Sequence, residues 1–473
     1  MNNTDIRKKI KIRAIRVIKR IKSAFKNQDV ILVLKLSAVA ATSLALSNIH
    51  NFFGTMMVGH VGEDAAEQIS AMGIALITIL TFSAPMNAFG SSAQSLISQL
   101  WGKGKRRDAF ISFKSALVTS FVISLFMCIL VFIFGEWLMK IMSPSQKVAN
   151  YGKKFLFVRI LGLPATSITF VMRGLFDAIG KPEEHLKFNA YSTFVCIVLS
   201  YLFVFGIIFP RMELHGFALA STISSFVAAI HGAYLIRPYI KQYFSSRDIS
   251  DIKYREDILK FALKNLKISI PAFFAQFIAS VSFLLFIWFS GLSGVEHQAI
   301  SFILVNIIGV ITLPAMAIGA SLAGMVGRLV GQNEIERAKR TFSDMIIIIG
   351  IVSSALSLLM ILFPETSMRL FSDQKEVIEE GKKTILTFSP SLLFISIGIL
   401  VINTLIGVGD TKFVIKVEAT LHFLFFIPSL FLFGTILKSK STVLWLVISI
   451  YFALLFFVML WRIISGKWIK KLT

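Results

Sequence analysis

One pair of side chains in the sequence combines an acid with a base at helical spacing. Glu418 and His422 lie four residues apart in an apolar stretch, and residues at positions i and i+4 point to the same side of a helix. A carboxylate and an imidazole placed in this way can share a proton, so both residues are candidates for proton coupling. The alternative is that Glu418 reaches the end of its helix while His422 forms a hydrogen bond with a neighbour.

Neutral polar side chains form a second group of candidates within apolar segments. Asn48, Asn51 and Thr55 are spaced at i, i+3 and i+7, which predicts one stripe along a helix. Amides and hydroxyls can bind a polar substrate, but packing between helices uses the same groups, at about 0.6 kcal/mol per contact. Both interpretations stay open. The other candidates for a substrate site are Asn87, Gln94, Gln276 and Asn306.

The sequence contains no pattern typical of an enzyme or of a metal site. It has no HExxH, GxSxG or P-loop motif. The two cysteines, Cys128 and Cys196, lie in separate apolar runs, which is typical of packing residues rather than of metal ligands or a disulfide. We therefore expect neither catalysis nor a cofactor, apart from a coupling ion, H⁺ or Na⁺.

The composition of the chain is that of a membrane protein. Hydrophobic residues account for 55% of the 473 residues and charged residues for 16%, whereas soluble domains carry about 25% charged residues. A membrane span requires roughly 20 mostly apolar residues. The sequence predicts an all-α membrane protein with twelve transmembrane helices, near residues 31–58, 66–92, 112–135, 153–176, 187–209, 215–236, 265–290, 298–323, 342–363, 384–405, 412–436 and 441–463.

Positive charge is concentrated between these segments and at the two ends of the chain. The formal net charge is +23, and basic residues beside spans mark the cytoplasmic side. Both termini are therefore predicted to be cytoplasmic in a multi-pass protein of the plasma (inner) membrane. Residues 1–29 combine this charge with apolar residues at helical spacing, which predicts an amphipathic helix that contacts anionic lipid headgroups; a solvated topology signal is the alternative. Nucleic acid is not an expected partner.

A repeat divides the chain into two halves. Both halves begin on the same side of the membrane, so they are predicted to be parallel repeats. The pairs that share an offset of 229 residues are Pro85 and Pro314, Gly90 and Gly319, Gly102 and Gly331, and Gly180 and Gly409. The predicted domains are a basic tail (1–29), an N-lobe (30–236), a cytoplasmic connector (237–264), a C-lobe (265–465) and a second basic tail (466–473).

Motifs within this repeat resemble those of the multidrug and toxic compound extrusion (MATE) transporters. SSAQSLISQLWGKGKRRDA (91–109) resembles the family's helix of small residues that ends in Gln-x-x-Gly and a basic loop. VMRGLFDAIGKP (171–182) and TLIGVGDTK (404–412) resemble its LRGxGDTK signature, and MMVGHVGEDAAEQISAMG (56–73) resembles the segment that closes its first span. The resemblance extends from about residue 30 to 465 and implies two six-helix lobes around a central cleft.

The chain departs from this family where the resemblance places polar or acidic residues. Gly54, Ala279 and Ile395 stand at positions where members carry an acid, and Cys196 and Ser200 stand at those of an Asn and an Asp. A carboxylate is the natural group for holding Na⁺ or a proton in a low-dielectric site. The usual coupling scheme of the family is therefore in doubt.

The resemblance implies a secondary transporter that exports small amphipathic or cationic organic compounds by alternating access, as an antiporter with H⁺ or Na⁺. The alternative is a flippase for a lipid-linked sugar or another amphiphile, which the missing acids and the basic inner surface would suit. A small organic substrate and membrane lipids are the expected partners of a protein that acts as a monomer.

Overall fold

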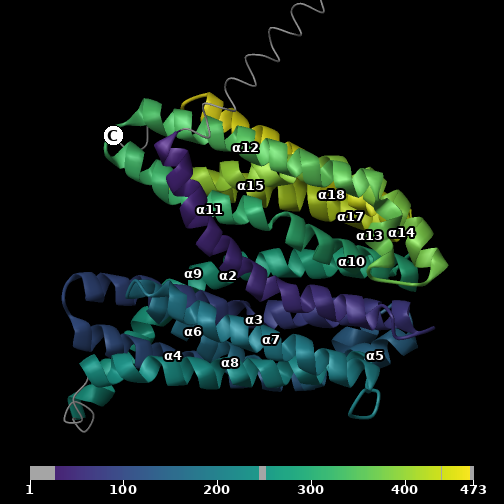
Figure 1. The fold of residues 1–473 in the computed structure, drawn as a ribbon, viewed down its shortest axis with the longest axis horizontal. Coiled ribbons are helices and arrows are strands. Elements are labelled where there is room, and N and C mark those ends of the chain that lie inside the picture. Colours follow the sequence, from purple (N-terminus) through teal and green to yellow (C-terminus); the bar gives the residue numbers. More distant parts are fainter. Residues whose placement is uncertain (1–26, 244–251, 438, 469–473) are drawn as a thin grey trace, which may run out of the picture. The chain divides into compact units, whose positions relative to one another are not determined.

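The computed structural model describes residues 27–243, 252–437 and 439–468, which form helices and turns without a β-strand (Figure 1). Residues 1–26 of the predicted amphipathic tail helix lie outside the described residues. The helices are α2 (Gln28–Val58), α3 (Ala65–Gly102), α4 (Arg106–Met142), α5 (Gln146–Ile160), α6 (Leu163–Ala178), α7 (Pro182–Phe205), α8 (Leu214–Tyr243), α9 (Ile252–Gly291), α10 (Val295–Ile311), α11 (Leu313–Gly331), α12 (Ile335–Leu362), α13 (Pro364–Arg369), α14 (Lys375–Phe388), α15 (Leu392–Gly407), α16 (Thr411–Leu421), α17 (Ile427–Phe431) and α18 (Ser441–Ile464), with a 3₁₀ turn η2 (Ser389–Ser391) and π-helical turns η3 (His422–Phe426) and η4 (Leu432–Ile436).

Within the described residues, ten helical segments are long and apolar enough to cross a membrane, or eleven if the bent pair α5–α6 is one span. The predicted span at 298–323 is divided between α10 and α11 close to Pro314, whose ring and missing N–H interrupt a helix. By contrast, α3 continues through Pro85. The predicted all-helical membrane fold is thus confirmed, whereas the count of twelve spans stays a prediction.

The chain forms two compact units that are discontinuous in sequence. Unit 1 contains the described residues of Met1–Asn48, Leu304–Met368 and Glu379–Thr473, and unit 2 contains those of Ile49–Ile303 and Arg369–Ile378. Helices α2 and α10 therefore contribute residues to both units, and α9 belongs to unit 2. The two lobes predicted from the sequence are each one continuous segment, whereas these units are not. Helices α8 and α9 also extend into residues 237–264, which were predicted to form a connector.

Two buried glutamines connect the helices of unit 2. Gln298 of α10 accepts a hydrogen bond from Ser70 of α3 and donates to the carbonyl oxygens of Met142 and Ile287, at 3.2 and 3.0 Å. Its side chain thus satisfies its own polar groups while joining four helices. Gln68 of α3 similarly accepts a hydrogen bond from the first backbone N–H of α8, at 3.0 Å. A buried amide without such partners would destabilise the bundle.

Two ion pairs connect the helices of unit 1 near their ends. Asp29, at the start of α2, accepts two hydrogen bonds from the guanidinium of Arg337 on α12, at 2.6 and 2.8 Å. Asp410 precedes α16, is fully buried, and binds the guanidinium of Arg462 on α18 at 2.7 Å. These bonds neutralise two buried carboxylates that would otherwise be costly.

Small residues allow close packing of one helix pair in each unit. In unit 2, a Cβ added at Gly174 of α6 would lie 2.5 Å from the carbonyl oxygen of Gly90 in α3. In unit 1, a Cβ at Gly407 of α15 would overlap the backbone of Ala323 in α11. Close backbone approach through small residues is a common way for membrane helices to pack.

We expect Gly174→Ala to destabilise the protein by about 1–3 kcal/mol, because the new methyl group must displace backbone rather than a flexible side chain. Gly324→Ala in α11 is the matched control, since no atom lies within 4 Å of its added Cβ. It should be neutral or stabilise the helix by about 0.5–1 kcal/mol. Thermal unfolding of the two purified variants in detergent measures the difference, and equal midpoints would contradict the proposed close packing.

Candidate functional site

A stripe of polar side chains is exposed along α3, a helix that is otherwise mostly buried in unit 2. Asn87, Ser91, Ser95 and Ser98 are exposed, and Gln94 is partly buried beside them. Their spacing of three or four residues places them along one side of the helix. The side chains of the predicted candidates Asn87 and Gln94 therefore belong to one surface.

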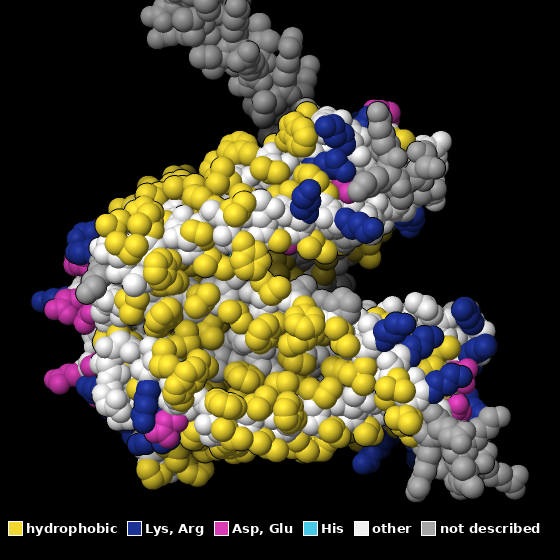
Figure 2. Space-filling model, turned by 180° about the vertical axis from the view of Figure 1, so that it is seen from behind, with side chains coloured by type: hydrophobic (Ala, Val, Ile, Leu, Met, Phe, Trp, Pro, Cys, Tyr) yellow, Lys and Arg dark blue, Asp and Glu magenta, His cyan; other side chains and the backbone are white. Residues whose placement is uncertain are grey.

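The exposed surface of α4 in the same unit has the opposite character. Val118, Val122, Phe126, Ile129 and Ile133 are each at least 55% exposed, as expected of a surface that contacts lipid. Hydrophobic side chains also cover much of the surface seen in Figure 2. Because lipid cannot hydrogen-bond to amides and hydroxyls, the polar stripe of α3 is suited to water or a polar ligand.

The structure brings together two residues that the sequence identified separately. The Asn87 amide of α3 donates a hydrogen bond to the Gln276 side-chain oxygen of α9, at 2.8 Å and at an exposed position. Each amide keeps further donors and acceptors for water or a ligand. Asn87, Gln276 and the serines of α3 therefore form a polar surface built from two helices of unit 2.

The equivalent surface in unit 1 lies on α11 and is much less polar. The residues 229 positions after Asn87, Ser91 and Ser95 are Met316, Ala320 and Gly324, and all six positions are exposed. The two helices thus expose the same positions, while the duplication itself stays a prediction. Only the stripe of unit 2 has retained amide and hydroxyl groups along its length.

The other neutral candidates are placed less distinctively. On α2, the Asn48 amide donates to the carbonyl oxygen of Leu44 and the Thr55 hydroxyl donates to that of Asn51, both at 2.8 Å. These hydrogen bonds stay within the helix and satisfy the polar atoms locally. Asn306 of α10 is partly buried and also has a polar partner. A packing role remains open for each of these residues.

Glu418 and His422 both lie in unit 1, at the junction of α16 and η3. The Nδ1 atom of His422 is 2.9 Å from the hydroxyl of Tyr451 on α18, and the rings of Phe426 and Tyr451 pack edge-on against the imidazole. Glu418 is partly buried and has no hydrogen bond or ion pair among the described residues. His422 thus interacts with a residue on another helix, which agrees with the second interpretation of this pair from the sequence. The Glu418 carboxylate is unpaired among the described residues.

The helix that carries this pair is interrupted by π geometry. The turns η3 and η4 enclose α17, which contains Pro428. Proline cannot donate a backbone hydrogen bond and its ring clashes with the carbonyl four residues earlier, so a wider turn relieves the conflict. π turns are rare and are found frequently at functional sites, which favours this segment as a candidate site.

Arg159 is a third polar feature, for which no functional role was predicted from the sequence. It lies one residue before the end of α5, and α6 begins at Leu163 at an angle of 50°. The predicted span 153–176 placed Arg159 near one end, where a long side chain can reach the headgroups. The observed pair instead extends from Gln146 to Ala178 and places Arg159 near its middle. A signal was available in the sequence, since Gly162 and Pro164 follow within five residues.

Gly54 and Ile395, two of the positions where the resemblance places an acid, lie in packed surroundings. A side chain at Gly54 would overlap the ring of Phe217, and Ile395 is 4% exposed. The Cys196 thiol lies 3.9 Å from the Ser200 hydroxyl and 3.7 Å from the Ser221 hydroxyl. Unit 2 therefore contains a small cluster of uncharged polar groups where the resemblance places an Asn and an Asp.

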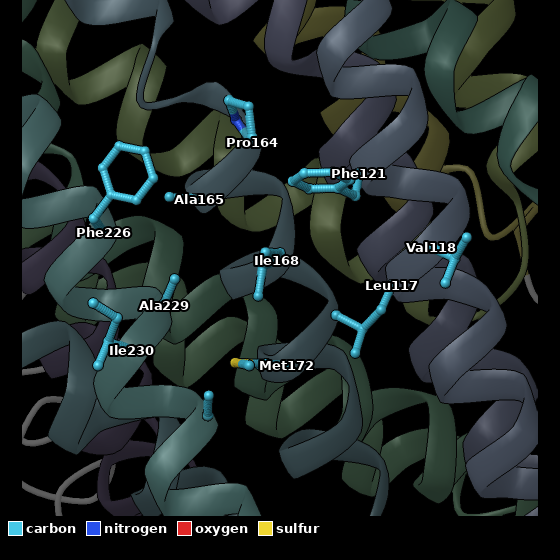
Figure 3. A pocket seen from close by; sticks show the side chains of 11 residues that line it. Leu117, Val118, Phe121, Pro164, Ala165, Ile168, Met172, Phe226, Ala229 and Ile230 are labelled. Atoms are coloured by element: carbon cyan, nitrogen blue, oxygen red, sulfur yellow. The ribbon is translucent and has the colours of Figure 1, made fainter. Parts of the chain in front are cut away.

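A groove of about 560 Å³ lies between α4, α6 and α8 of unit 2 and is lined by hydrophobic side chains (Figure 3). Phe121, Phe226 and Ile230 line it and are also exposed. They continue the lipid-facing surface of α4, so the groove belongs to that surface rather than to the polar stripe of α3.

Comparison with known proteins agrees with this architecture. A family model described as MatE matches residues 40–202 and again residues 271–432, more than half of the chain. The chain belongs to the MatE family. The MatE family consists of transporters, and this MatE protein is a multi-pass integral membrane transporter.

Individual MatE relatives cover almost the whole chain. A probable multidrug resistance protein NorM of Thermotoga maritima is 22% identical over 93% of each protein. An inward-facing multidrug resistance MATE transporter is similar in structure, with a TM-score of 0.76, 17% identity, and coverage of 90% of this chain and 96% of the other. A transporter of Pyrococcus furiosus, reported to have a binding pocket of reversed polarity, has a TM-score of 0.70, 16% identity, and coverage of 93% and 96%.

We expect cysteines introduced on the polar stripe to react with a charged, membrane-impermeant maleimide. Ser91→Cys and Ser95→Cys should be labelled because water supports the reactive thiolate. Val122→Cys and Phe126→Cys of α4 are the controls, and lipid should protect them. The native Cys128 and Cys196 are buried, so the unmodified protein supplies the background. Equal labelling of both pairs would contradict the assignment of the two surfaces.

Proposed function

We propose that this MatE protein is a secondary active transporter of the plasma membrane that exports small amphipathic or cationic organic compounds by alternating access. The observation that supports this proposal most is the polar stripe of α3, together with membership of the family. The NorM relative is named as a probable multidrug resistance protein, which supports export of organic compounds. These relatives do not favour the alternative of a lipid-linked sugar flippase.

The polar stripe of α3 with Gln276 is the proposed contact for the substrate. Its exposed groups are amides and hydroxyls, which can hydrogen-bond to many polar groups without selecting one charge. Such a surface suits the polar groups of compounds of differing structure.

Proton coupling is proposed to depend on Glu418. Its carboxylate is partly buried within a spanning helix and lacks a partner among the described residues, and an ionisable residue in such a position is a functional candidate by default. Its titratable neighbours are His422, on the next turn, and Tyr451 of α18, which is bonded to His422. These groups could stabilise or exchange the proton as the transporter changes conformation.

Ethidium counterflow in proteoliposomes tests whether the protein transports an organic cation. Vesicles loaded with unlabelled ethidium should accumulate labelled ethidium transiently, because exchange requires no ion gradient. Asn87→Ala combined with Gln276→Ala should slow this exchange while thermal stability changes by less than about 1.5 kcal/mol, since the removed hydrogen bond is exposed. Absence of exchange by the wild-type protein, with a panel of such cations, would contradict the proposed function.

Uptake driven by a pH gradient tests the role of Glu418. Glu418→Gln should abolish the stimulation of uptake by the gradient and retain counterflow, because the amide cannot release a proton. Glu376→Gln, an exposed acid at the start of α14, is the control and should keep both activities. A wild-type response to the gradient that survives in Glu418→Gln would show that the proton is carried elsewhere.

A further inference from the structure

The hydrophobic groove of unit 2 is open along the surface that contacts lipid. Figure 3 shows residues of α6, such as Ala165 and Ile168, at its base between residues of α4 and α8. Val118 of α4 and Ile230 of α8 line its two sides and are 57% and 70% exposed. Water has no hydrogen-bonding partner between such side chains. The groove is therefore suited to a hydrocarbon chain.

The length of the groove matches the depth of one lipid leaflet. One end lies at Pro164, just after the break between α5 and α6. At 1.5 Å per residue, the lining residues of α8 from Phe226 to Ala233 extend over about 10 Å, and Arg237 lies about 6 Å further along the helix. The hydrocarbon core of a bilayer is about 30 Å thick, so each leaflet contributes about half of this length. One acyl chain can therefore lie in the groove with its headgroup near Arg237.

Two basic side chains lie at the end of the groove where α4 begins and α8 ends. Lys114 precedes the lining residue Leu117 of α4 by three residues. Arg237 follows the lining residue Ala233 of α8 by four. Both spacings place the cation on the side of its helix that lines the groove. Arg237 is exposed and has no ion pair among the described residues, and Lys114 is partly buried.

The helices around this end of the groove carry an excess of positive charge. Most of their acidic side chains already have a basic partner: the ion pairs are Asp177 with Arg173, Glu183 with Lys181, and Glu184 with Lys187. Further exposed cations on and between these helices are Lys103, Lys105, Arg107 and Lys241. Asp108, on the first turn of α4, is the remaining acid of the described part of α4, α6, α7 and α8 at this end. The charge therefore favours an anionic headgroup.

We propose that this groove binds one anionic phospholipid, with an acyl chain between α4 and α8 and its headgroup between Lys114 and Arg237. A guanidinium can donate two parallel hydrogen bonds to phosphate oxygens, and an ammonium group attracts phosphate as a point charge. A zwitterionic lipid carries the same phosphate together with a cation, which the excess positive charge repels. The binding site lies within unit 2 and is separate from the polar stripe of α3 and from Glu418.

Binding of phosphatidylglycerol to the delipidated full-length protein in detergent tests this proposal, with phosphatidylcholine of the same acyl chains as the reference. Native mass spectrometry separates the protein with one bound lipid from the free protein and yields a Kd for each lipid. The wild-type protein should bind its first phosphatidylglycerol at least tenfold more tightly than phosphatidylcholine. Its unfolding midpoint should rise by about 1–2 °C at a tenfold excess over Kd. Inorganic phosphate should not raise the midpoint, because it has no chain to occupy the groove.

Lys114→Gln combined with Arg237→Gln tests the role of the two cations. This variant should bind both lipids with equal affinity, because the charges that distinguish the headgroups are gone while the groove is unchanged. Lys412→Gln combined with Lys416→Gln is the matched control for net charge, since both lysines are exposed on α16 of unit 1. The control should keep the preference for phosphatidylglycerol.

Ala233→Leu tests the groove without changing its charge. The larger side chain should weaken the binding of both lipids about tenfold, because it occupies the space of the acyl chain. Val122→Leu is the control, since Val122 is 58% exposed on α4 and does not line the groove. It should change either Kd by less than twofold.

These outcomes decide the proposal independently of transport, because binding is measured without a substrate or gradient. Equal affinities of the wild-type protein for the two lipids would overturn it, as would a preference that survives in the variant without Lys114 and Arg237. A midpoint that rises equally with inorganic phosphate would show an anion site that needs no lipid. If the variant without both cations cannot be purified, equal lipid affinities of Ala233→Leu and Val122→Leu would overturn the proposal.

Discussion

The inability of lipid to hydrogen-bond constrains every polar group in this protein. Each amide, hydroxyl or charge in a spanning helix must find a partner within the protein, face water, or be destabilising. Gln68 and Gln298 have partners within the protein and connect several helices of unit 2. The polar stripe of α3 is instead suited to face water. The contrast between that stripe and the hydrophobic surface of α4 is what identifies a candidate substrate surface.

The same constraint explains why glycine contacts matter in this fold. Because lipid is as apolar as leucine, apolar side chains gain little by leaving lipid for one another, and membrane helices associate through close packing instead. Gly174 beside Gly90 brings α6 against α3, the helix that carries the polar stripe. A Cβ added at Gly174 would also lie 3.4 Å from the Cβ of Gln94, so the packing of small residues places α6 directly beside the polar stripe of α3.

Much of the fold could be predicted from hydrophobic segments alone, because a spanning helix needs a length that few other structures share. The family could be predicted from motifs that recur at one offset. Contacts between distant segments could not. Asn87 and Gln276 were each recognisable as polar residues in apolar helices, but nothing in the sequence pairs residues 189 positions apart. Likewise, the Tyr451 partner of His422 follows only from the packing of α18.

The position of Arg159 within its pair of helices escaped prediction for a different physical reason. Its depth depends on where a span begins, and the polar residues of early α5, such as Lys147 and Lys153, placed that start too late. In the structure these lysines bind Asp64 and Glu136 at 2.5 Å, which allows the helix to begin earlier. The break between α5 and α6 then lies beside the arginine, near the middle of the pair Gln146–Ala178.

The two π turns around α17 have a consequence for the register of the whole segment. A π turn contains one residue more than an α turn, and one residue corresponds to about 100° of rotation around a helix. If η3 adopted α geometry while η4 kept its form, the side chains on one side of the turn would rotate by about that angle relative to those on the other. A change of one residue in the winding of the segment around Pro428 would therefore rotate the part of the helix that carries Glu418, while the helix axis stays continuous.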